Sequence, residues 1–334
     1  MSYNVLFARW ARTYAEATAE YFRLNNDPVR LARQIADTQY RSGQRLSAHI
    51  YQLSLLIEGL TALDKLLNGN SGLRELRSQL LTVVTDTFNK SGFHYFDQCY
   101  LPEDLDTTAT VTRVTGTCFP EVVQAYDSIL NRNQMGDGKY PTWLDAPNWT
   151  SLCCGSRPWH ADVMMNLLTT QCLLGRSISS EVITSIATES ELRNYWYIQR
   201  LYTPYFYCRL AKLAGLERTK HVVKPLLDVL RRQDMNTLGT DPRMLDLVRT
   251  SQHRPLDTLL THLLESYSNP EAVDRGIPAF NPEEFDNIAL YWSFGYTPYD
   301  STPVSRSFVA TVLDTFSSDI VTETPLCQRA SRVG

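Results

Sequence analysis

Residues 101–109 read Leu-Pro-Glu-Asp-Leu-Asp-Thr-Thr-Ala, a proline and acidic residues followed by an apolar and threonine-rich run. Asp is favoured at a helix N-cap because its carboxylate accepts hydrogen bonds from the first unpaired N–H groups of the helix. The stretch therefore predicts a helix capped by Asp104, with Asp106 in its first turn. Ordinary capping accounts for these acids, and a chemical role is the alternative.

Apolar residues recur at helical spacing on both sides of this stretch. Between Leu46 and Leu67 they fall on every third or fourth position, and the run ends at Asn68-Gly69, a pair that favours the left-handed backbone of a helix C-cap. No segment alternates as a half-buried strand does. The same period predicts two helices in the first forty residues and others near 76–84, 122–129, 163–174, 180–188, 193–214, 219–232, 241–250, 255–267 and 303–317.

The predicted helices follow one another with short Gly, Asn and Pro breaks, and no Pro/Ser-rich or charge-rich tract separates two halves. We therefore expect one all-α domain over residues 1–334. About a dozen helices suit an α/α toroid, a barrel of helix pairs with an inner and an outer ring, better than a four-helix bundle. No clean repeat is visible, so the toroid depends on the helix number and on the resemblance described below.

Composition excludes several classes of protein. The 334-residue chain has a net charge of -4, which gives no basic surface for a nucleic-acid partner. No apolar run is long enough to cross a membrane, and the first residues carry Arg and Glu where a signal peptide needs an apolar block, so we expect a cytoplasmic protein. The 7 cysteines and 6 histidines show no spacing typical of a metal site, a disulfide framework or a catalytic triad.

One long connection interrupts the helical pattern. Residues 133–159 have no helical period but contain Trp143, Trp149 and Trp159. A loop of this length inside a compact domain is usually functional or disordered, and the tryptophans argue against disorder. We expect the loop to close over a cavity. The alternative is that its tryptophans only anchor it to the outer helices.

The acidic stretch resembles the general-acid motif of class II terpene cyclases. Here Asp-Leu-Asp-Thr-Thr follows a group of aromatic residues: Phe93, Tyr95, Phe96 and Tyr100. Residues 161–168 are similar to the Asp-Val-x-x-Asn helix start of these enzymes, and residues 195–197 and 202–207 are similar to their aromatic Tyr-x-Pro stretch. The resemblance covers roughly residues 45–315 and implies a β-type cyclase domain.

The resemblance also implies roles for three residues. Asp106 is the middle acid of the motif, which in this family delivers a proton to a terminal alkene, and Asp104 and Asn166 would assist it. Such a proton comes from a neutral carboxylic acid. Burial and a neighbouring Asp104 anion would raise the pKa of Asp106, whereas the helix N-terminus favours its carboxylate. Asn166 could hydrogen-bond the acid and orient it.

The motif has Thr107 where most triterpene and diterpene cyclases have a further Asp. The Asp-x-Asp-Thr-Thr form is similar to drimane-type sesquiterpene cyclases. It therefore implies an isomerase or intramolecular lyase that converts a linear prenyl diphosphate, farnesyl diphosphate above all, to a bicyclic drimane-type product with the diphosphate retained. No phosphatase motif is present, which leaves open whether the diphosphate product is released intact or is processed by a separate phosphatase. A single domain also needs its own loop or a second copy in a homo-oligomer to close the cavity.

Aromatic rings around such an acid would exclude water and stabilise a carbocation by cation–π attraction, although aromatic residues of an α-domain are more often plain core. Arg157 is a candidate contact for the diphosphate. The other candidates for contact with the substrate are Thr107, Thr108, Trp159, Trp196, Tyr202, Tyr205, Phe206, Trp292 and Phe294.

Class I chemistry, which ionises the diphosphate, needs clustered acids that hold several magnesium ions, and no Asp-Asp-x-x-Asp motif is present. The resemblance implies Mg²⁺ as a cofactor, but the sequence shows no ligand set for it. Two further hypotheses stay open. One is an α/α-toroid carbohydrate-active enzyme that pairs Asp104 or Asp106 with a distant acid such as Glu284. The other is a non-catalytic isoprenoid-binding domain.

Overall fold

The chain is helical wherever its longer elements are described. The computed structural model describes residues 3–40, 49–86, 93, 102–136, 138–145, 159–189, 201–215, 254–269, 277–278, 280–286, 288, 292–293, 297–298 and 301–317. Its helices are α1 (Tyr3–Leu24), α2 (Pro28–Tyr40), α3 (His49–Leu66), α4 (Ser71–Thr85), α5 (Leu105–Thr115), α6 (Pro120–Asn133), α8 (Ala161–Leu173), α9 (Ser180–Glu189), α10 (Tyr202–Leu213), α13 (Arg254–Ser268) and α14 (Thr302–Ser317). The all-α prediction is confirmed for this part of the chain.

Three short elements accompany the helices. A 3₁₀ helix, η4, spans Pro282–Phe285, and the two-residue strands β1 (Trp292–Ser293) and β2 (Thr297–Pro298) pair antiparallel. Periodicity did not predict the strands, because two residues are too few to show an alternation.

Local sequence signals set several helix ends where they were predicted. The helix expected to stop at Asn68-Gly69 does so: Asn68 and Gly69 have φ angles of 57° and 107°, and Gly69 N donates to Asp64 O at 2.8 Å. Within the helix predicted over 193–214, α10 begins at Tyr202, and residues 193–200 lie outside the described residues. The helices predicted over 219–232 and 241–250 also lie outside them.

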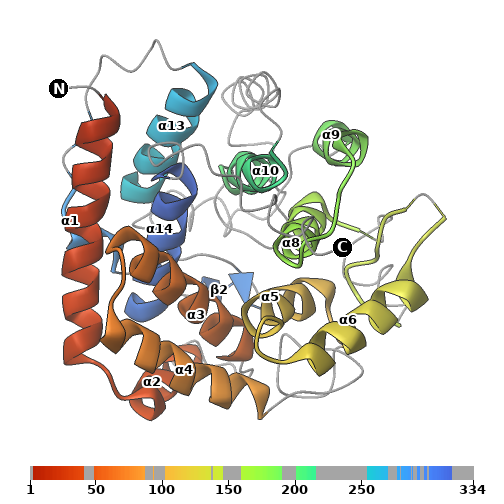
Figure 1. Ribbon diagram of the computed structural model, residues 1–334, viewed down its shortest axis with the longest axis horizontal. Helices are drawn as coiled ribbons and strands as arrows, with labels where there is room; N and C mark the ends of the chain where they lie inside the picture. Colours follow the sequence, from red (N-terminus) through yellow and green to blue (C-terminus); the bar gives the residue numbers. More distant parts are fainter. Residues whose placement is uncertain are drawn as a thin grey trace, which may run out of the picture.

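The helices α3, α5, α8, α10 and α14, here called the central helices, occupy the middle of the molecule (Figure 1). Contacts run from α14 to α3, from α3 to α5, from α5 to α8 and from α8 to α10. The rings of Tyr205 on α10 and Phe308 on α14 lie 5.8 Å apart, so α10 contacts α14 as well. Around them lie α1 on one side, α2 and α4 below, and α6 and α9 on the opposite side (Figure 1).

Helices α3 and α14 run in the same direction along their contact. Near their middles Gly59 meets Ser307, and one to two turns later Lys65 Nζ lies 3.2 Å from Asp314 Oδ2. Because residue numbers increase in the same direction along both helices, the N-terminal ends of α3 and α14 lie at the same end of the pair.

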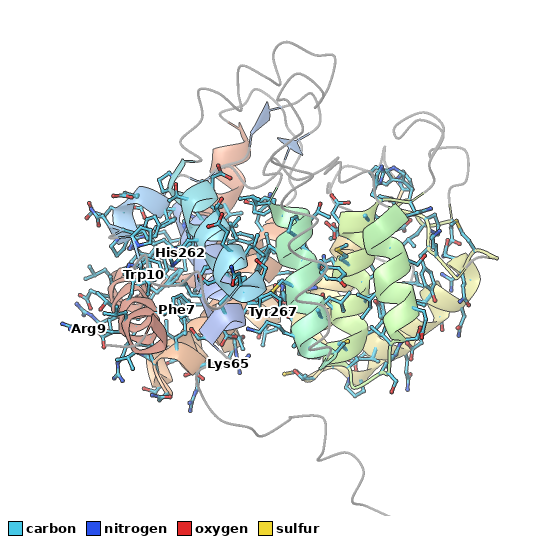
Figure 2. The ribbon with its side chains drawn as sticks, turned by 90° about the horizontal axis from the view of Figure 1, so that it is seen from above. Phe7, Arg9, Trp10, Lys65, His262 and Tyr267 are labelled. Carbon is cyan, nitrogen blue, oxygen red and sulfur yellow. The ribbon has the colours of Figure 1, made fainter. Side chains whose placement is uncertain are left out.

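Helix α1 covers the outer side of this core with one face. Figure 2 shows Phe7 pointing into the molecule and Arg9 pointing away from it, and the exposures agree, since Phe7 is buried and Arg9 exposed. Trp10 lies between Phe7 and Arg9 in the helical projection. Its ring centroid is 5.4 Å from the ring centroid of Phe280. The 3.6-residue period thus directs the apolar stripe of α1 inward.

Among the described helices, none combines the length and the apolar character that a membrane-spanning helix needs.

Candidate active site

The acidic stretch forms the start of α5, as its capping pattern predicts. Asp104 has an extended backbone, and its Oδ1 accepts a hydrogen bond from Thr107 N at 2.7 Å. This bond satisfies one of the N–H groups that a helix leaves unpaired at its N-terminus. Asp104 is therefore the N-cap of α5, and Asp106 lies in the first turn.

The loop after α6 forms backbone hydrogen bonds with the residues at the start of α5. Leu105 N donates to Thr142 O at 2.9 Å, and Leu144 N donates to Glu103 O at 2.8 Å. Between these bonds Trp143 pairs with Asp104 in an antiparallel bridge, and its side chain is 4% exposed. This part of the loop is thus an anchor for the acid motif. Residues 146–158 lie outside the described residues, so the predicted closure of the loop over a cavity stays a prediction.

Asp106 meets Asn166, the residue that the second motif singled out. Asn166 Nδ2 donates to Asp106 Oδ1 at 2.6 Å and to Thr110 Oγ1 at 2.8 Å. Asp106 is 9% exposed and Asn166 3% exposed. Two motifs that lie 60 residues apart in the sequence therefore share one buried hydrogen bond.

Helical spacing explains why these side chains converge. Asp106, Thr110 and Arg113 occupy positions i, i+4 and i+7 of α5 and so share one face, and Asn166 and Thr170 are i and i+4 on α8. The two faces meet where α5 packs on α8. Each polar side chain then has a partner on the other helix.

Arg113 continues the network away from Asp106. One guanidinium nitrogen, Nη1, donates to Asn166 Oδ1 and, at 3.1 Å, to Thr170 Oγ1. Its other two nitrogens clamp the carboxylate of Glu58 on α3, with Nε–Oε1 at 2.8 Å and Nη2–Oε2 at 2.9 Å. Glu58 also accepts a hydrogen bond from Arg209 on α10. The network therefore connects four central helices.

The charges of this network offset one another. Burial by itself would raise the pKa of Glu58, but the guanidinium groups of Arg113 and Arg209 outweigh it and lower the pKa to about 2. For Arg209, burial by itself would lower the pKa, and the Glu58 carboxylate instead raises it above its ordinary value. Glu58 is thus an anion at any pH at which the protein would function.

A small cavity adjoins the network. It has a volume of about 10 Å³ and is lined by Tyr51, Leu55, Glu58, Arg113, Asn166, Phe206, Arg209, Phe308 and Thr311. This volume suits about one water molecule, whereas small-molecule sites usually measure about 300–1,000 Å³. The cavity therefore lies against Asn166 and does not itself have room for a prenyl diphosphate.

The predicted aromatic residues of α10 are buried, and one of them lines this cavity. Phe206 lines the cavity, and Tyr202 and Tyr205 are fully buried. Their rings lie 5.2 and 5.8 Å from that of Phe308 on α14. Burial raises the pKa of Tyr205 to about 12, so its hydroxyl stays neutral. The three residues form an aromatic wall between α10 and α14.

The two threonines of the motif are buried in α5. Thr108 Oγ1 accepts a hydrogen bond from Phe93 N at 3.0 Å, which gives it a structural task. Thr107 donates its backbone N–H to Asp104, and its Oγ1 has no hydrogen-bond partner within the described part of the chain. Trp159, partly buried just before α8, has Lys139 Nζ 4.6 Å above its ring.

Some predicted residues are not placed. Trp196, Phe294 and Arg157 lie outside the described residues, and for Trp292 only the backbone, in β1, is described. Their proposed contacts with substrate stay predictions.

Sequence reasoning missed Glu58, Arg113 and Arg209. Each stands in an apolar or threonine-rich helical run, Leu-Leu-Ile-Glu-Gly-Leu for Glu58, Thr-Val-Thr-Arg-Val-Thr for Arg113 and Tyr-Cys-Arg-Leu-Ala for Arg209. A single charge within such a run is the signal that could have marked them, since buried charges need partners.

The described residues show no cluster of ligands for a metal ion. No group of three or more His, Cys, Asp or Glu side chains within the described ranges lies close enough together to hold a metal ion. No metal ligand is therefore assigned, and magnesium stays a prediction of the family resemblance.

A larger hollow lies on another side of the molecule and contains none of the predicted residues. It measures about 650 Å³ and is bordered by α1, the α3–α4 turn and α4. Its lining includes the acidic residues Glu16, Glu20 and Glu75. Glu20 is paired with Arg23 at 2.6 Å.

Comparisons with known proteins add no family. No protein-family model matches the chain, and no curated protein matches its sequence.

Proposed function

We propose that this protein is a class II terpene cyclase that starts cyclisation by protonating a linear prenyl diphosphate. The observation that carries the proposal is the buried hydrogen bond between Asp106 and Asn166, at 2.6 Å. This bond joins Asp106 of the first motif to Asn166 of the second motif. The family resemblance assigns both residues to one reaction, so it expects them to be in contact. Its substrate would be farnesyl diphosphate, and its product a bicyclic drimane-type diphosphate.

The proposed first step uses Asp106 as the acid. The neutral carboxylic acid gives its proton to the terminal carbon of the substrate's last double bond, and the π electrons of that bond form the new C–H bond. The adjacent carbon becomes a tertiary carbocation, which the next double bonds attack to close the rings. Asp106 is left as a carboxylate, whose Oδ1 the Asn166 amide stabilises. A proton leaves the final cation, and the diphosphate is not cleaved.

The surroundings of Asp106 suit a reaction that must exclude water. Asp106 is 9% exposed, and Phe206 of the aromatic wall lines the small cavity next to Asn166. Ring faces attract a cation without acting as a base, so such a wall can stabilise a carbocation and leave it unreacted.

We further propose that the central helices form the inner ring of an α/α toroid. The contacts from α14 through α3, α5, α8 and α10 and back to α14 by way of Tyr205 and Phe308 support a closed ring. The helices that surround them in Figure 1 would form the outer ring.

A carbohydrate-active enzyme is a poorer fit. Such an enzyme needs a second carboxyl group facing Asp104 or Asp106 across the substrate. Glu284, the acid considered for this role, is exposed in η4, which packs against α1, α13 and α14. None of these three helices carries Asp104 or Asp106, which lie at the start of α5.

The test is to incubate the purified protein with geranyl, farnesyl or geranylgeranyl diphosphate and magnesium, to treat the products with phosphatase, and to analyse them by mass spectrometry. We expect a cyclic alcohol from farnesyl diphosphate and none from the Asp106→Asn variant. The matched control is Asp86→Asn, which removes an exposed carboxylate at the end of α4 and should keep full activity.

Only linear alcohols from wild-type protein with every substrate would refute the proposal. Product formation that survives Asp106→Asn would leave a cyclase but assign the proton to another group. A non-catalytic isoprenoid-binding domain would bind the substrate and return it unchanged.

A further inference from the structure

We infer that Arg113, held by Glu58, is a positioning residue that fixes the Asn166 side chain and so assigns the transferable proton of Asp106 to Oδ2. The inference rests on the proposed function, because it concerns the acid of that reaction. It adds a role for a residue whose described hydrogen bonds go to Asn166, Thr170 and Glu58.

The argument begins with the donor and acceptor chemistry of the Asn166 amide. An amide has one acceptor end and one donor end, and an arginine guanidinium can only donate. The end of the amide that faces Arg113 must therefore be Oδ1, as the hydrogen bond from Arg113 Nη1 to Asn166 Oδ1 has it. Because the amide is planar, its nitrogen then faces Asp106 and Thr110.

This orientation leaves the two Asp106 oxygens different. Oδ1 accepts an N–H hydrogen bond from Asn166 at 2.6 Å. In a neutral carboxylic acid the carbonyl oxygen is the better acceptor, and the hydroxyl oxygen is the donor. Oδ1 is therefore the carbonyl oxygen, and the proton lies on Oδ2. If the amide were rotated by half a turn, its oxygen would face Asp106 and would instead accept that proton.

Arg113 can fix the amide because its own position is fixed. Its guanidinium binds Glu58 through two parallel hydrogen bonds of 2.8 and 2.9 Å, and its Nη1 also donates to Thr170 at 3.1 Å. Such a bidentate fork has one geometry, which a lysine ammonium cannot reproduce. The Arg113 side chain is 3% exposed, so bulk solvent has little access to these bonds.

Arg209 provides a matched control within the same network. Like Arg113 it is almost completely buried and hydrogen-bonds to Glu58, with whole-residue exposures of 9% and 8%. The described hydrogen bonds of Arg209 do not include Asn166, whereas those of Arg113 do. Replacing either by lysine should therefore weaken the Glu58 cluster, but only the change at Arg113 should release the amide.

The experiment compares kcat and KM of wild type, Arg113→Lys and Arg209→Lys, and repeats Arg113→Lys in an Asn166→Ala background. We expect Arg113→Lys to lower kcat by roughly 100-fold with little change in KM, as misplacement of a catalytic group does. Arg209→Lys weakens the Glu58 cluster as well and should lower kcat by less than Arg113→Lys, because the hydrogen bond from Arg113 to Asn166 is kept. In the Asn166→Ala background, Arg113→Lys should cause no further loss, because its effect passes through Asn166.

Equal losses of kcat in Arg113→Lys and Arg209→Lys, or additive losses in the double variant, would overturn the inference. A second measurement requires neither turnover nor a variant protein. It follows hydrogen exchange of the Asn166 side-chain amide in the wild-type protein by NMR with labelled asparagine. Both amide protons should exchange far more slowly than those of an exposed asparagine, and rapid exchange of both would also overturn the inference. If the wild-type protein forms no cyclic product, the proposed function is refuted. The hydrogen-exchange result would then still test whether the Asn166 side chain is held in place.

Discussion

Gly59 on α3 and Ser307 on α14 lie so close that a Cβ atom built on Gly59 would be 2.2 Å from Ser307 Cβ. Only a residue without a side chain allows the two helices to approach in this way. The approach also brings Glu58, the neighbour of Gly59, into the middle of the central helices.

Gly59→Ala should therefore destabilise the protein, because α3 and α14 must separate or the backbone must shift. Overpacking of this kind costs about 1–3 kcal/mol, which exceeds the gain of up to about 1 kcal/mol from alanine in a helix. The free energy of unfolding in urea measures the change. Gly72→Ala is the control, since the nearest atom to its Cβ would be 3.5 Å away, and it should be neutral or stabilising. A stable Gly59→Ala variant would contradict the close packing.

Glu58 should make stability depend on pH in the acidic range. Its pKa in the folded protein is about 2, below the ordinary glutamate value of 4.5. A lowered pKa means that the folded state holds the proton less tightly than the unfolded state. The contribution is therefore complete above pH 4.5 and is lost as the pH falls towards 2, amounting to about 3 kcal/mol.

Urea unfolding of wild type and Glu58→Gln between pH 7 and pH 2 tests this. The variant should be less stable by about 3–5 kcal/mol at pH 7, because two buried arginines lose their partner. The two curves should approach each other near pH 2, where wild-type Glu58 is protonated as well. A constant difference over the whole range would show that Glu58 is not ionised in the folded protein.

Asp104 should stabilise α5 mainly as a cap. Asp104→Ala removes the acceptor for Thr107 N and should cost about 1 kcal/mol, whereas Asp104→Asn keeps an acceptor and should cost much less. Thermal unfolding distinguishes them. Asn70→Ala, which removes the equivalent cap of α4, gives the loss for an N-cap away from the site. Equal losses for Asp104→Asn and Asp104→Ala would instead assign the stabilisation to the charge.

Trp143 should hold the loop after α6 against the acid motif. Its side chain is 4% exposed, and truncation of a buried tryptophan to alanine costs about 3–5 kcal/mol. Trp159→Ala should cost less, because Trp159 is only partly buried. Chemical unfolding of the two variants measures the difference. A smaller loss for Trp143→Ala than for Trp159→Ala would mean that the loop is anchored elsewhere.

Features that depend on neighbouring residues were predictable from the sequence. The end of α3 at Asn68-Gly69 and the cap of α5 at Asp104 both follow from backbone groups that near residues satisfy. The helical period predicted most described helices for the same reason, since it repeats every 3.6 residues. Asp106 and Asn166 were also predicted from the sequence, but only through the family resemblance. Their hydrogen bond was inferred from that resemblance and follows from no local pattern.

Tertiary structure decided the rest of the candidate site. Glu58, Arg113 and Arg209 lie on three helices, and the apolar or threonine-rich run around each one indicates a buried charge but does not identify its partner. Burying one such charge is costly, and the cost is offset only when the other helices bring the opposite charges within hydrogen-bond distance. That distance depends on how α3, α5 and α10 pack, and no local pattern contains it. The sequence by itself therefore determined the helices and their caps, and only the packing of the helices decided which charges could be buried together.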